Sequence, residues 1–442
     1  MSAASSRDAA RVVVVGGGFG GIATALRLAK LGHSVTLLEA GPELGGRLRP
    51  VRHAGVVWDS GPTTLTLPPV LRDLFRKSGR PLEAELDLVP CQPGRRHVFD
   101  DTVLDLPFGS RAAQRDALGE ALGGSAATAW TEHLDALSDV WEVLRRRTLD
   151  VPFAGRESLD RDAMRVLRPR RRLSTVARRL GPDPRLRALL LDRHRLAGQQ
   201  PRALPGFLGV VDHVERGFGR WRVVGGMAAL LPVLERRLGT RGVDVRLRTS
   251  AVDVRCRDGR AHSVLTAEAG ELDADVVVWS APRRPPLLGT TSGRQPTPAI
   301  PAARTYLALE GELPELPAET FLHGDPLVLV RSGATASNGL TAWSVEHRQD
   351  GEDVVTTMAR RGLDVRRQVG ARVTRSPAQL VAAHGGSPAG MLWQGWRSGL
   401  RRPGPRTAVK GLYLIGADVH PGPGLISAGL AAAQVAGDVG RS

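Results

Sequence analysis

Apolar and polar positions at the start of the chain follow the order strand, turn, helix, strand. Arg11–Val15 is a continuous valine run, Gly16–Gly21 is a glycine-rich turn, and Ile22–Leu31 has apolar residues at helical spacing. A second apolar run, Ser34–Leu38, comes after Gly32. Two such runs on either side of a helix are typical of a parallel βαβ unit with a buried sheet. The sequence therefore predicts that a parallel sheet begins here.

The same patterns recur along the rest of the chain and predict an α/β fold. Helices are predicted at residues 70–78, 111–147, 227–238 and 425–439, and short helices joined by loops at residues 150–205. Strands are predicted at residues 243–247, 252–256, 262–267, 276–279 and 411–415, with strand-like segments continuing to about residue 346. The proline, glycine and serine content of residues 285–301 predicts a loop.

Length and composition indicate an ordinary globular protein. The 442 residues are enough for about three domains, or two large ones, at roughly 150 residues per domain. Cys91 and Cys256 are the only cysteines, so neither a disulfide framework nor a zinc site is indicated, and no metal is expected. Residues 1–10 do not resemble a signal peptide, and the apolar stretch 425–439 is too short for a membrane span. We expect a cytoplasmic protein.

The charge balance leaves the partner open. The formal net charge is +16, and of the 61 basic residues only Lys30, Lys77 and Lys410 are lysines. Such an excess attracts anionic lipid or nucleic acid without choosing between them. No basic motif interleaved with aromatic residues is present, so nucleic-acid binding is not expected.

The glycine-rich turn carries the first chemical signal. Gly16, Gly18 and Gly21 form a G-x-G-x-x-G pattern, in which glycines allow a tight turn and a close approach of a pyrophosphate to the backbone. The helix that begins near Gly20 offers free N–H groups and a positive dipole. Glu39, followed by Ala40, ends the second strand, where a carboxylate accepts ribose hydroxyl groups. The pattern predicts dinucleotide binding rather than a mere tight turn.

A second glycine pair favours a flavin over a nicotinamide dinucleotide. Gly45, Gly46 and Arg47 follow shortly after Glu39 and let the chain return to the pyrophosphate, whose charge Arg47 is suited to offset. Such a return suits the long, extended FAD molecule.

These residues, with several later motifs, resemble the FAD-dependent amine oxidase superfamily and within it the bacterial phytoene desaturase (carotenoid desaturase) branch. The later motifs are Val57–Thr63, which contains Gly61, Trp221–Met227, Gly385–Gly390, Gly411–Ala417 and His420–Gly422. The resemblance implies a Rossmann-type FAD-binding domain of the GR2 type, formed by residues 1–80, 218–285 and 400–442. It also implies an inserted α+β substrate-binding or cap domain, formed by residues 81–217 and 286–399.

The resemblance extends to individual site residues. By position, Val252 is similar to the family residue that meets the adenine through its backbone, and Asp418 to an acidic residue that binds the ribityl chain or pyrophosphate, although it stands one residue late. The N-terminus of the last helix, near Leu425 and Ile426, is expected to direct its dipole at the reduced flavin. His420 is the one catalytic candidate, with bracing of its Pro/Gly turn as the alternative.

Residue usage favours an apolar substrate. No lysine occurs between Lys77 and Lys410, and Tyr306 and Tyr413 are the only tyrosines, so neither the lysine nor the aromatic cage of typical amine oxidases is available. We therefore expect FAD-dependent dehydrogenation of a small lipophilic, carotenoid-like or terpenoid-like substrate by hydride transfer to the flavin, with oxygen or a quinone as electron acceptor.

Several alternatives stay open. Ser427 and Ala428 replace the Pro-Gly turn of close relatives, which speaks against phytoene itself. An amine oxidase or a protoporphyrinogen-oxidase-like enzyme is the alternative within the family, and a non-catalytic prenyl or lipid carrier of the same fold is the alternative outside catalysis. An arginine cluster followed by Leu189–Leu191 has two interpretations, peripheral contact with a membrane or a surface that is simply solvated. The arginines are Arg165, Arg168, Arg170, Arg171, Arg172, Arg178 and Arg179.

Overall fold

A five-stranded parallel sheet draws its strands from three separate parts of the chain. The computed structural model describes residues 9–289, 296–348 and 351–442. The strand order is β19-β13-β1-β2-β9, and every neighbouring pair is parallel. The bounds are β1 (Arg11–Val15), β2 (Ser34–Leu38), β9 (Asp244–Arg246), β13 (Val276–Trp279) and β19 (Leu412–Leu414).

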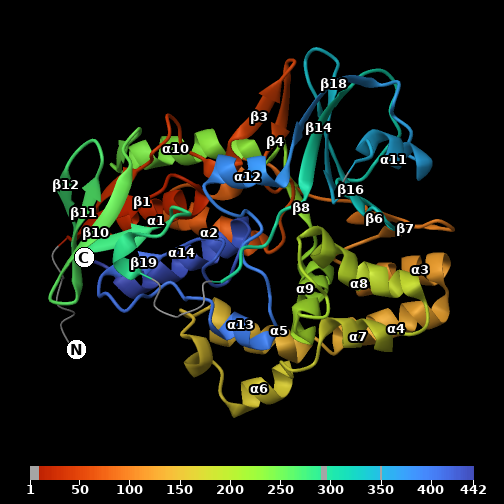
Figure 1. Ribbon diagram of the computed structural model, residues 1–442, viewed down its shortest axis with the longest axis horizontal. Coiled ribbons are helices and arrows are strands. Elements are labelled where there is room, and N and C mark those ends of the chain that lie inside the picture. Colours follow the sequence, from red (N-terminus) through yellow and green to blue (C-terminus); the bar gives the residue numbers. More distant parts are fainter. Residues whose placement is uncertain (1–8, 290–295, 349–350) are drawn as a thin grey trace.

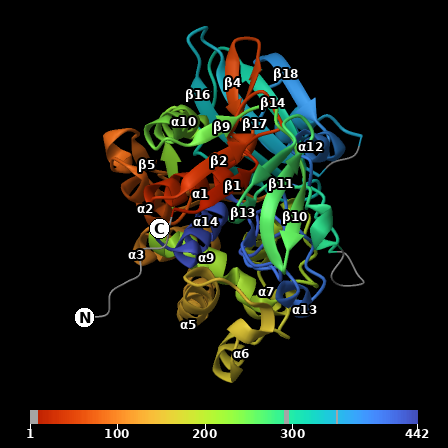
Figure 2. The ribbon, with the colours of Figure 1, turned by 90° about the vertical axis from the view of Figure 1, so that its left-hand side faces the viewer.

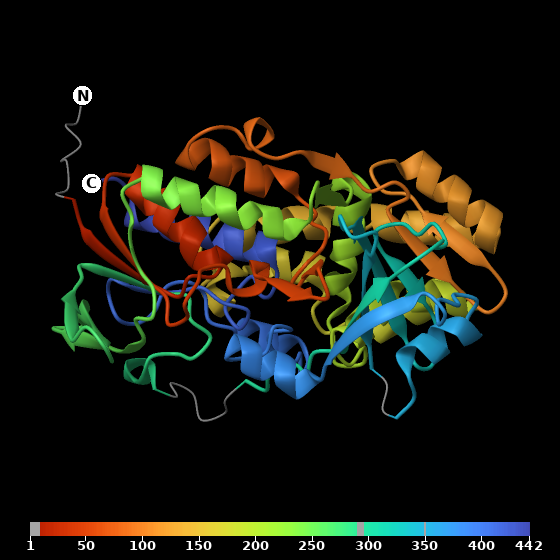
Figure 3. The same cartoon turned by 90° about the horizontal axis from the view of Figure 1, so that it is seen from above.

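Both faces of this sheet are covered, which explains the unbroken apolar runs of its strands. Side chains alternate along β1, so that Val12 and Val14 pack against helices whereas Val13 and Val15 pack against a small sheet on the other face. The helices are α1 (Phe19–Lys30), α2 (Pro68–Ser78), α10 (Leu230–Thr240) and α14 (Leu425–Val439). The small sheet contains β10 (Ala251–Arg257), β11 (Arg260–Thr266) and β12 (Glu271–Asp273). Figure 3 shows α10 lying beside α1 over the sheet.

A second, seven-stranded sheet forms the opposite end of the molecule (Figure 1). Its order is β18-β14-β17-β16-β15-β6-β7, with β15 and β6 parallel and the other pairs antiparallel. The bounds are β6 (Arg95–Val98), β7 (Val103–Leu106), β14 (Ala303–Leu309), β15 (Thr320–Leu322), β16 (Val328–Thr335), β17 (Thr341–His347) and β18 (Val369–Arg375). Two short antiparallel pairs, β3 (Pro50–His53) with β4 (Val56–Asp59) and β5 (Leu88–Pro90) with β8 (Trp221–Val223), complete the described strands.

A group of helices with its own core adjoins the second sheet. It contains α3 (Arg111–Leu122), α4 (Gly124–Asp135), α5 (Ser138–Leu144), α6 (Arg161–Leu167), α7 (Leu173–Arg179), α8 (Pro184–Leu196) and α9 (Val210–Phe218). Leu189, Leu190 and Leu191 are buried in this core. Neither of the two alternatives, a membrane-facing or a solvated surface, therefore holds for these leucines. The remaining helices are α11 (Val354–Arg360), α12 (Pro377–His384) and α13 (Trp396–Leu400).

Most of the elements predicted from local patterns are confirmed. The final helix has the expected bounds, and the helical region 111–147 is divided into α3, α4 and α5. Eight strands were not predicted, namely β3, β4, β5, β6, β7, β8, β12 and β18. Residues 290–295 of the predicted loop lie outside the described residues, as do residues 1–8. Among the described residues, no helix is long and apolar enough to cross a membrane.

Candidate functional site

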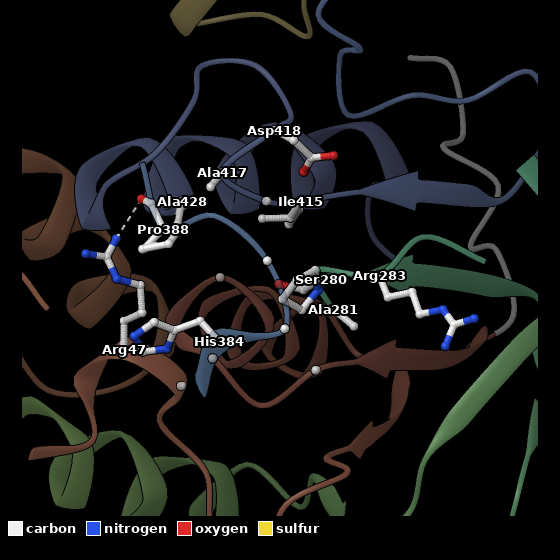
Figure 4. Close-up of a pocket in the computed structure, with 18 of the residues that line it drawn as sticks. Arg47, Ser280, Ala281, Arg283, His384, Pro388, Ile415, Ala417, Asp418 and Ala428 are labelled. Carbon is white, nitrogen blue, oxygen red and sulfur yellow. Dashed lines mark hydrogen bonds between the residues drawn. The ribbon is translucent and has the colours of Figure 1, made fainter. Parts of the chain in front are cut away.

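A large cavity lies where four strands of the parallel sheet end. Its volume is about 1180 Å³, and the residues that follow β1, β2, β13 and β19 all line it, namely Gly16, Glu39, Ser280 and Ile415. Open parallel sheets bind their ligands at this carboxyl edge. Residues 383–388 and the start of α14 line another part of the same cavity (Figure 4).

The glycine turn is fixed by close backbone contacts. Gly16 has a φ of +100°, which L side chains rarely adopt. A Cβ atom on Gly21 would lie 2.0 Å from the carbonyl oxygen of Gly16, so only glycine fits there. Gly18 has open space at its Cβ position and lines the cavity, as do Gly16 and Gly20. The turn thus brings bare backbone and the N-terminus of α1 to the cavity wall.

The carboxylate of Glu39 ties the turn to the end of β2. One oxygen, Oε2, accepts a hydrogen bond from the Gly17 amide at 2.7 Å, and the other, Oε1, accepts one from the Gly41 amide at 2.7 Å. Glu39 and Ala40 both line the cavity. Since a carboxylate has about four acceptor positions, lone pairs are left for the hydroxyl groups of a ribose.

Arg47 presents to the cavity a cation that has no carboxylate partner among the described residues. Its Nη1 donates to the Pro388 carbonyl at 3.1 Å, while its Nε is buried with no partner (Figure 4). Burial and then the positive charge of Arg304 lower the pKa of Arg47 to about 10. A buried guanidinium in this state is stabilised by a bound anion such as a pyrophosphate. The adjacent Gly46 also lines the cavity.

The imidazole of His384 lies beside Arg47 in the cavity wall (Figure 4). It ends α12, and its ring makes no hydrogen bond to any described residue. Burial first, then the charges of Arg47, Arg375, Arg304 and Arg49, lower the pKa of His384 to about 4. The ring is therefore neutral at physiological pH and has a free lone pair. His384 was not predicted from the sequence, where its only signal was its place before Gly385 and Gly386.

Asp418 lines the cavity, but its charge is already matched. Arg284 donates to Asp418 Oδ2 through Nη2 at 2.6 Å and through Nε at 2.9 Å. Arg284, also unnoticed in the sequence analysis, lines the same cavity. A carboxylate neutralised in this way is compatible with a neighbouring pyrophosphate, because the ion pair removes most of its repulsion.

Four of the expected binding residues lie just behind the cavity wall. Gly21 packs against Gly16, and a Cβ atom on Gly61 would lie 2.5 Å from the Arg47 carbonyl oxygen, so both shape the wall without lining it. Val252 and Ile426 do not line the cavity, whereas their neighbours Ala251 and Leu425 do. The side chain of Val252 is exposed and that of Ile426 packs against the main core.

His420 lies outside the cavity, contrary to the expectation of a catalytic role. Its Nε2 donates to the Thr148 carbonyl at 2.9 Å, and its ring stacks on Phe153 with centroids 4.3 Å apart. Burial lowers the pKa of His420 to about 4. The ring thus joins the loop before α14 to the helical region, which agrees with the alternative that it braces the Pro/Gly turn.

The cavity as a whole fits a flavin dinucleotide. The unpartnered Nε of Arg47 and the open space at Gly18 form an anion site, and the Glu39 carboxylate lies at the end of the adjacent strand. The N-terminus of α14 contributes Gly424, Leu425 and Ala428 to the far part of the wall. When bound, a flavin supplies the acceptor for a hydride.

Comparison with known proteins identifies the family. The sequence profile described as flavin containing amine oxidoreductase matches residues 19–304, and the chain belongs to this family. The protein is therefore a flavin-dependent oxidoreductase. The predicted combination of a Rossmann-type domain with a substrate domain is confirmed by solved structures of the same fold.

The relatives that are similar in sequence are carotenoid enzymes, and a protein of similar structure is an amine oxidase. Hydroxyneurosporene desaturase of Cereibacter sphaeroides is 28% identical, with 96% of both chains covered. The zeta-carotene-forming phytoene desaturase of Myxococcus xanthus is 32% identical, with 63% of this chain and 54% of the relative covered. A putrescine oxidase structure with bound putrescine has a TM-score of 0.66 at 16% identity, covering 97% of this chain and 98% of that chain. The expected resemblance to the carotenoid desaturase branch is confirmed.

Proposed function

We propose that the protein is an FAD-dependent dehydrogenase that introduces a double bond into a carotenoid or a similar lipophilic polyene. The observation that carries this proposal is the match to hydroxyneurosporene desaturase over 96% of both chains. The cavity supports it, because its described lining contains neither lysine nor tyrosine with which to hold and activate an amine. Dehydrogenation of a hydrocarbon mainly requires burial and positioning of the C–H bonds.

The binding roles follow from the wall of the cavity. We assign the pyrophosphate of FAD to Gly16, Gly18, Gly20, Gly46 and Arg47, and the adenosine ribose to Glu39, next to Ala40. Backbone of residues 249–251, immediately before Val252, is assigned to the adenine. Gly21 and Gly61 shape the wall, and Asp418 acts as a pair with Arg284. The proposed FAD-binding domain comprises residues 1–80, 218–285 and 400–442, and the substrate domain comprises residues 81–217 and 286–399.

Removal of two hydrogens needs a proton acceptor as well as a hydride acceptor. A bound flavin would accept one substrate hydrogen as hydride, together with the electron pair of its C–H bond, and the adjacent carbon would lose a proton as the double bond forms. His384 is a neutral base on the cavity wall, whereas Glu39 is engaged by two amides and Asp418 by Arg284. A weak base is sufficient, because a proton beside a carbon that has lost hydride is strongly acidic. We assign this proton to His384.

Anaerobic bleaching of the flavin absorption tests the function. Carotenoid precursors in liposomes are expected to bleach the band of the purified protein, whereas a panel of amines leaves it unchanged. Reoxidation by oxygen or by a quinone then identifies the electron acceptor. Bleaching by amines alone would mean that an amine oxidase occupies this fold. A folded protein without a flavin band would support the carrier alternative.

Replacement of His384 by glutamine is expected to slow flavin reduction by about 10²-fold to 10⁴-fold, the usual contribution of a positioned base. Flavin content should stay unchanged, because the ring makes no hydrogen bond to the described chain. In the unsubstituted protein, reduction should be insensitive to pH above about 5 and slow as the pH approaches 4, where the imidazole gains a proton. Stopped-flow absorption measures both effects.

His53→Gln is the matched control for this experiment. His53 is an exposed residue of β3 that does not line the cavity, so its replacement should leave the reduction rate unchanged. An unchanged rate in His384→Gln would remove His384 from the reaction. The pH dependence would then belong to another group.

A further inference from the structure

The helices α6 and α13 lie on the side of the molecule away from the second sheet (Figures 1 and 2). Residues of both helices line a second hollow of about 660 Å³. Its lining combines guanidinium groups with apolar side chains. The arginines are Arg156, Arg161, Arg168, Arg170 and Arg171, and the apolar residues are Leu159, Met164, Pro169, Trp396 and Leu400. Asp160 is the single acidic residue of the lining.

The arginines of this hollow have no carboxylate partners. None of the five forms an ion pair with another described residue, whereas their neighbour Arg165 pairs with Asp162 at 2.6 Å. Asp160 is already occupied, since it caps α6 through the Ala163 amide at 2.8 Å and pairs with Arg147 at 2.6 Å. The hollow therefore carries an uncompensated positive charge, which favours an anionic ligand.

Arg171 is the arginine of the hollow whose guanidinium is least compensated by the described residues around it. Its Nε is buried without a partner, and burial, followed by the charges of Arg179 and Arg168, lowers the pKa of Arg171. A bound phosphate would relieve both the missing hydrogen bond and the repulsion. A free anion would leave the apolar part of the lining unused, whereas an amphiphile would cover it.

The hollow adjoins the flavin cavity through a single short helix. Trp396 and Leu400 of α13 line the hollow, and the next residue, Arg401, lines the large cavity together with Pro403. A lipid bound in the hollow would therefore lie next to this part of the cavity wall. This arrangement suits a substrate that is dissolved in lipid.

We propose that the hollow between α6 and α13 binds an anionic phospholipid of a membrane surface, with its phosphate on Arg168, Arg170 and Arg171 and its acyl chain against Trp396 and Leu400. Docking there brings the part of the cavity wall that contains Arg401 and Pro403 next to the lipid. Delivery of a polyene rests on the proposed function, but binding of the phospholipid does not. The peripheral membrane contact is thus assigned to this hollow instead of to Leu189–Leu191, which are buried.

Flotation with vesicles tests the proposal without any substrate. The holoenzyme is expected to float with phosphatidylglycerol–phosphatidylcholine vesicles at low salt and to stay behind with pure phosphatidylcholine. The triple variant R168Q/R170Q/R171Q should bind the anionic vesicles about 100-fold more weakly, which corresponds to about 3 kcal/mol at 1.4 kcal/mol per tenfold change. The visible flavin band verifies that the variant is folded.

The triple variant R255Q/R257Q/R260Q is the matched control. These three arginines are exposed on β10 and β11, form no ion pair with the described residues and do not line either cavity, and their replacement removes the same charge. The control should float as the unaltered protein does. Equal losses in the two variants would show a non-specific charge effect and overturn the proposal.

Quenching by brominated phospholipid tests the acyl-chain part of the hollow. Bromine on the acyl chain is expected to quench a fraction of the tryptophan fluorescence. In the variant Trp396→Phe most of this quenching should be lost, while flotation is preserved. Inorganic phosphate at millimolar concentration should not release the protein. Full release by phosphate, with no quenching by bromine, would identify a free-anion site and contradict the lipid assignment. If R168Q/R170Q/R171Q no longer floats but its flavin is still reduced by the polyene, phospholipid binding and the proposed function are separate properties.

Discussion

Replacement of Gly21 by valine is expected to weaken flavin binding by roughly 100-fold. The first atom of the new side chain would lie 2.0 Å from the Gly16 carbonyl oxygen, which belongs to the backbone of the turn and has no rotamer with which to move aside. The turn must open, and the backbone of Gly16, Gly18 and Gly20 then leaves the cavity wall. Overpacking of this kind costs about 3 kcal/mol, or roughly 100-fold in affinity. Flavin absorption per protein and titration of the apoprotein with FAD measure the loss.

Gly437→Ala serves as the control for the glycine turn. Gly437 lies in α14, and a Cβ atom there meets nothing within 4 Å. Flavin binding should be unchanged, and stability should rise slightly, because alanine is the better helix former. Retention of FAD by Gly21→Val at its normal affinity would contradict the assignment of this turn to the pyrophosphate.

Replacement of Glu215 by glutamine is expected to cost about 3–5 kcal/mol of folding stability, the usual effect of removing one partner from a buried ion pair. The Glu215 carboxylate is fully buried and contacts three guanidinium groups, those of Arg220 at 2.6 Å, Arg193 at 2.8 Å and Arg95 at 3.2 Å. Arg95 and Arg220 also contact Glu319, at 3.0 and 2.7 Å, so the network joins α9 to the second sheet. Denaturant unfolding measures the change.

The same network predicts sensitivity to acid. Burial alone would raise the pKa of Glu215, but Arg193, Arg95 and Arg220 outweigh burial and hold it well below its usual range. Against the same burial, Arg220 and Arg95 lower the pKa of Glu319 to about 2. Since these folded pKa values lie below the unfolded values, their stabilisation is present above about pH 4.5 and is lost as the pH falls towards 2.

Asp212 acts in the opposite direction. Burial raises the pKa of Asp212 to about 6 although Arg193 lowers it, so folding becomes less favourable as the pH rises from about 4 to 6.

Glu142→Gln is the control for Glu215→Gln. The side chain of Glu142 is partly exposed and pairs with Arg145 and Arg146 in the next turn, so its replacement should leave stability nearly unchanged. An equal loss of stability in Glu215→Gln and Glu142→Gln would mean that the buried network does not hold α9 and the second sheet together.

The sequence allowed much of the first sheet and its cavity to be predicted. The valine run of β1, the glycine spacing and Glu39 are local signals, because each depends on residues that are neighbours in the chain or in one βαβ unit. The structure accordingly has β1, β2 and α14 within the predicted bounds and brings Glu39, Gly46 and Arg47 to one cavity.

Other features depend on contacts that no local pattern records. His384 meets Arg47, and Arg284 meets Asp418, across more than a hundred residues of sequence, so neither pair had a signal in spacing or periodicity. His420 had the residue type and the loop position of a catalytic group, but Thr148 and Phe153 draw its ring away from the cavity. The leucines at 189–191 were assigned to a surface, facing either a membrane or solvent, and only their packing among the helices shows that they are buried.

By itself, the sequence determined the βαβ start, the dinucleotide signature and the family, because glycine conformation, strand alternation and helix spacing act over a few residues. Only the tertiary structure decided which cavity residues retain free lone pairs or unmatched charge. That outcome depends on which side chains compete for each partner after distant segments have packed, as with the paired Asp418, the unpaired Arg47 and the uncompensated arginines beside α6.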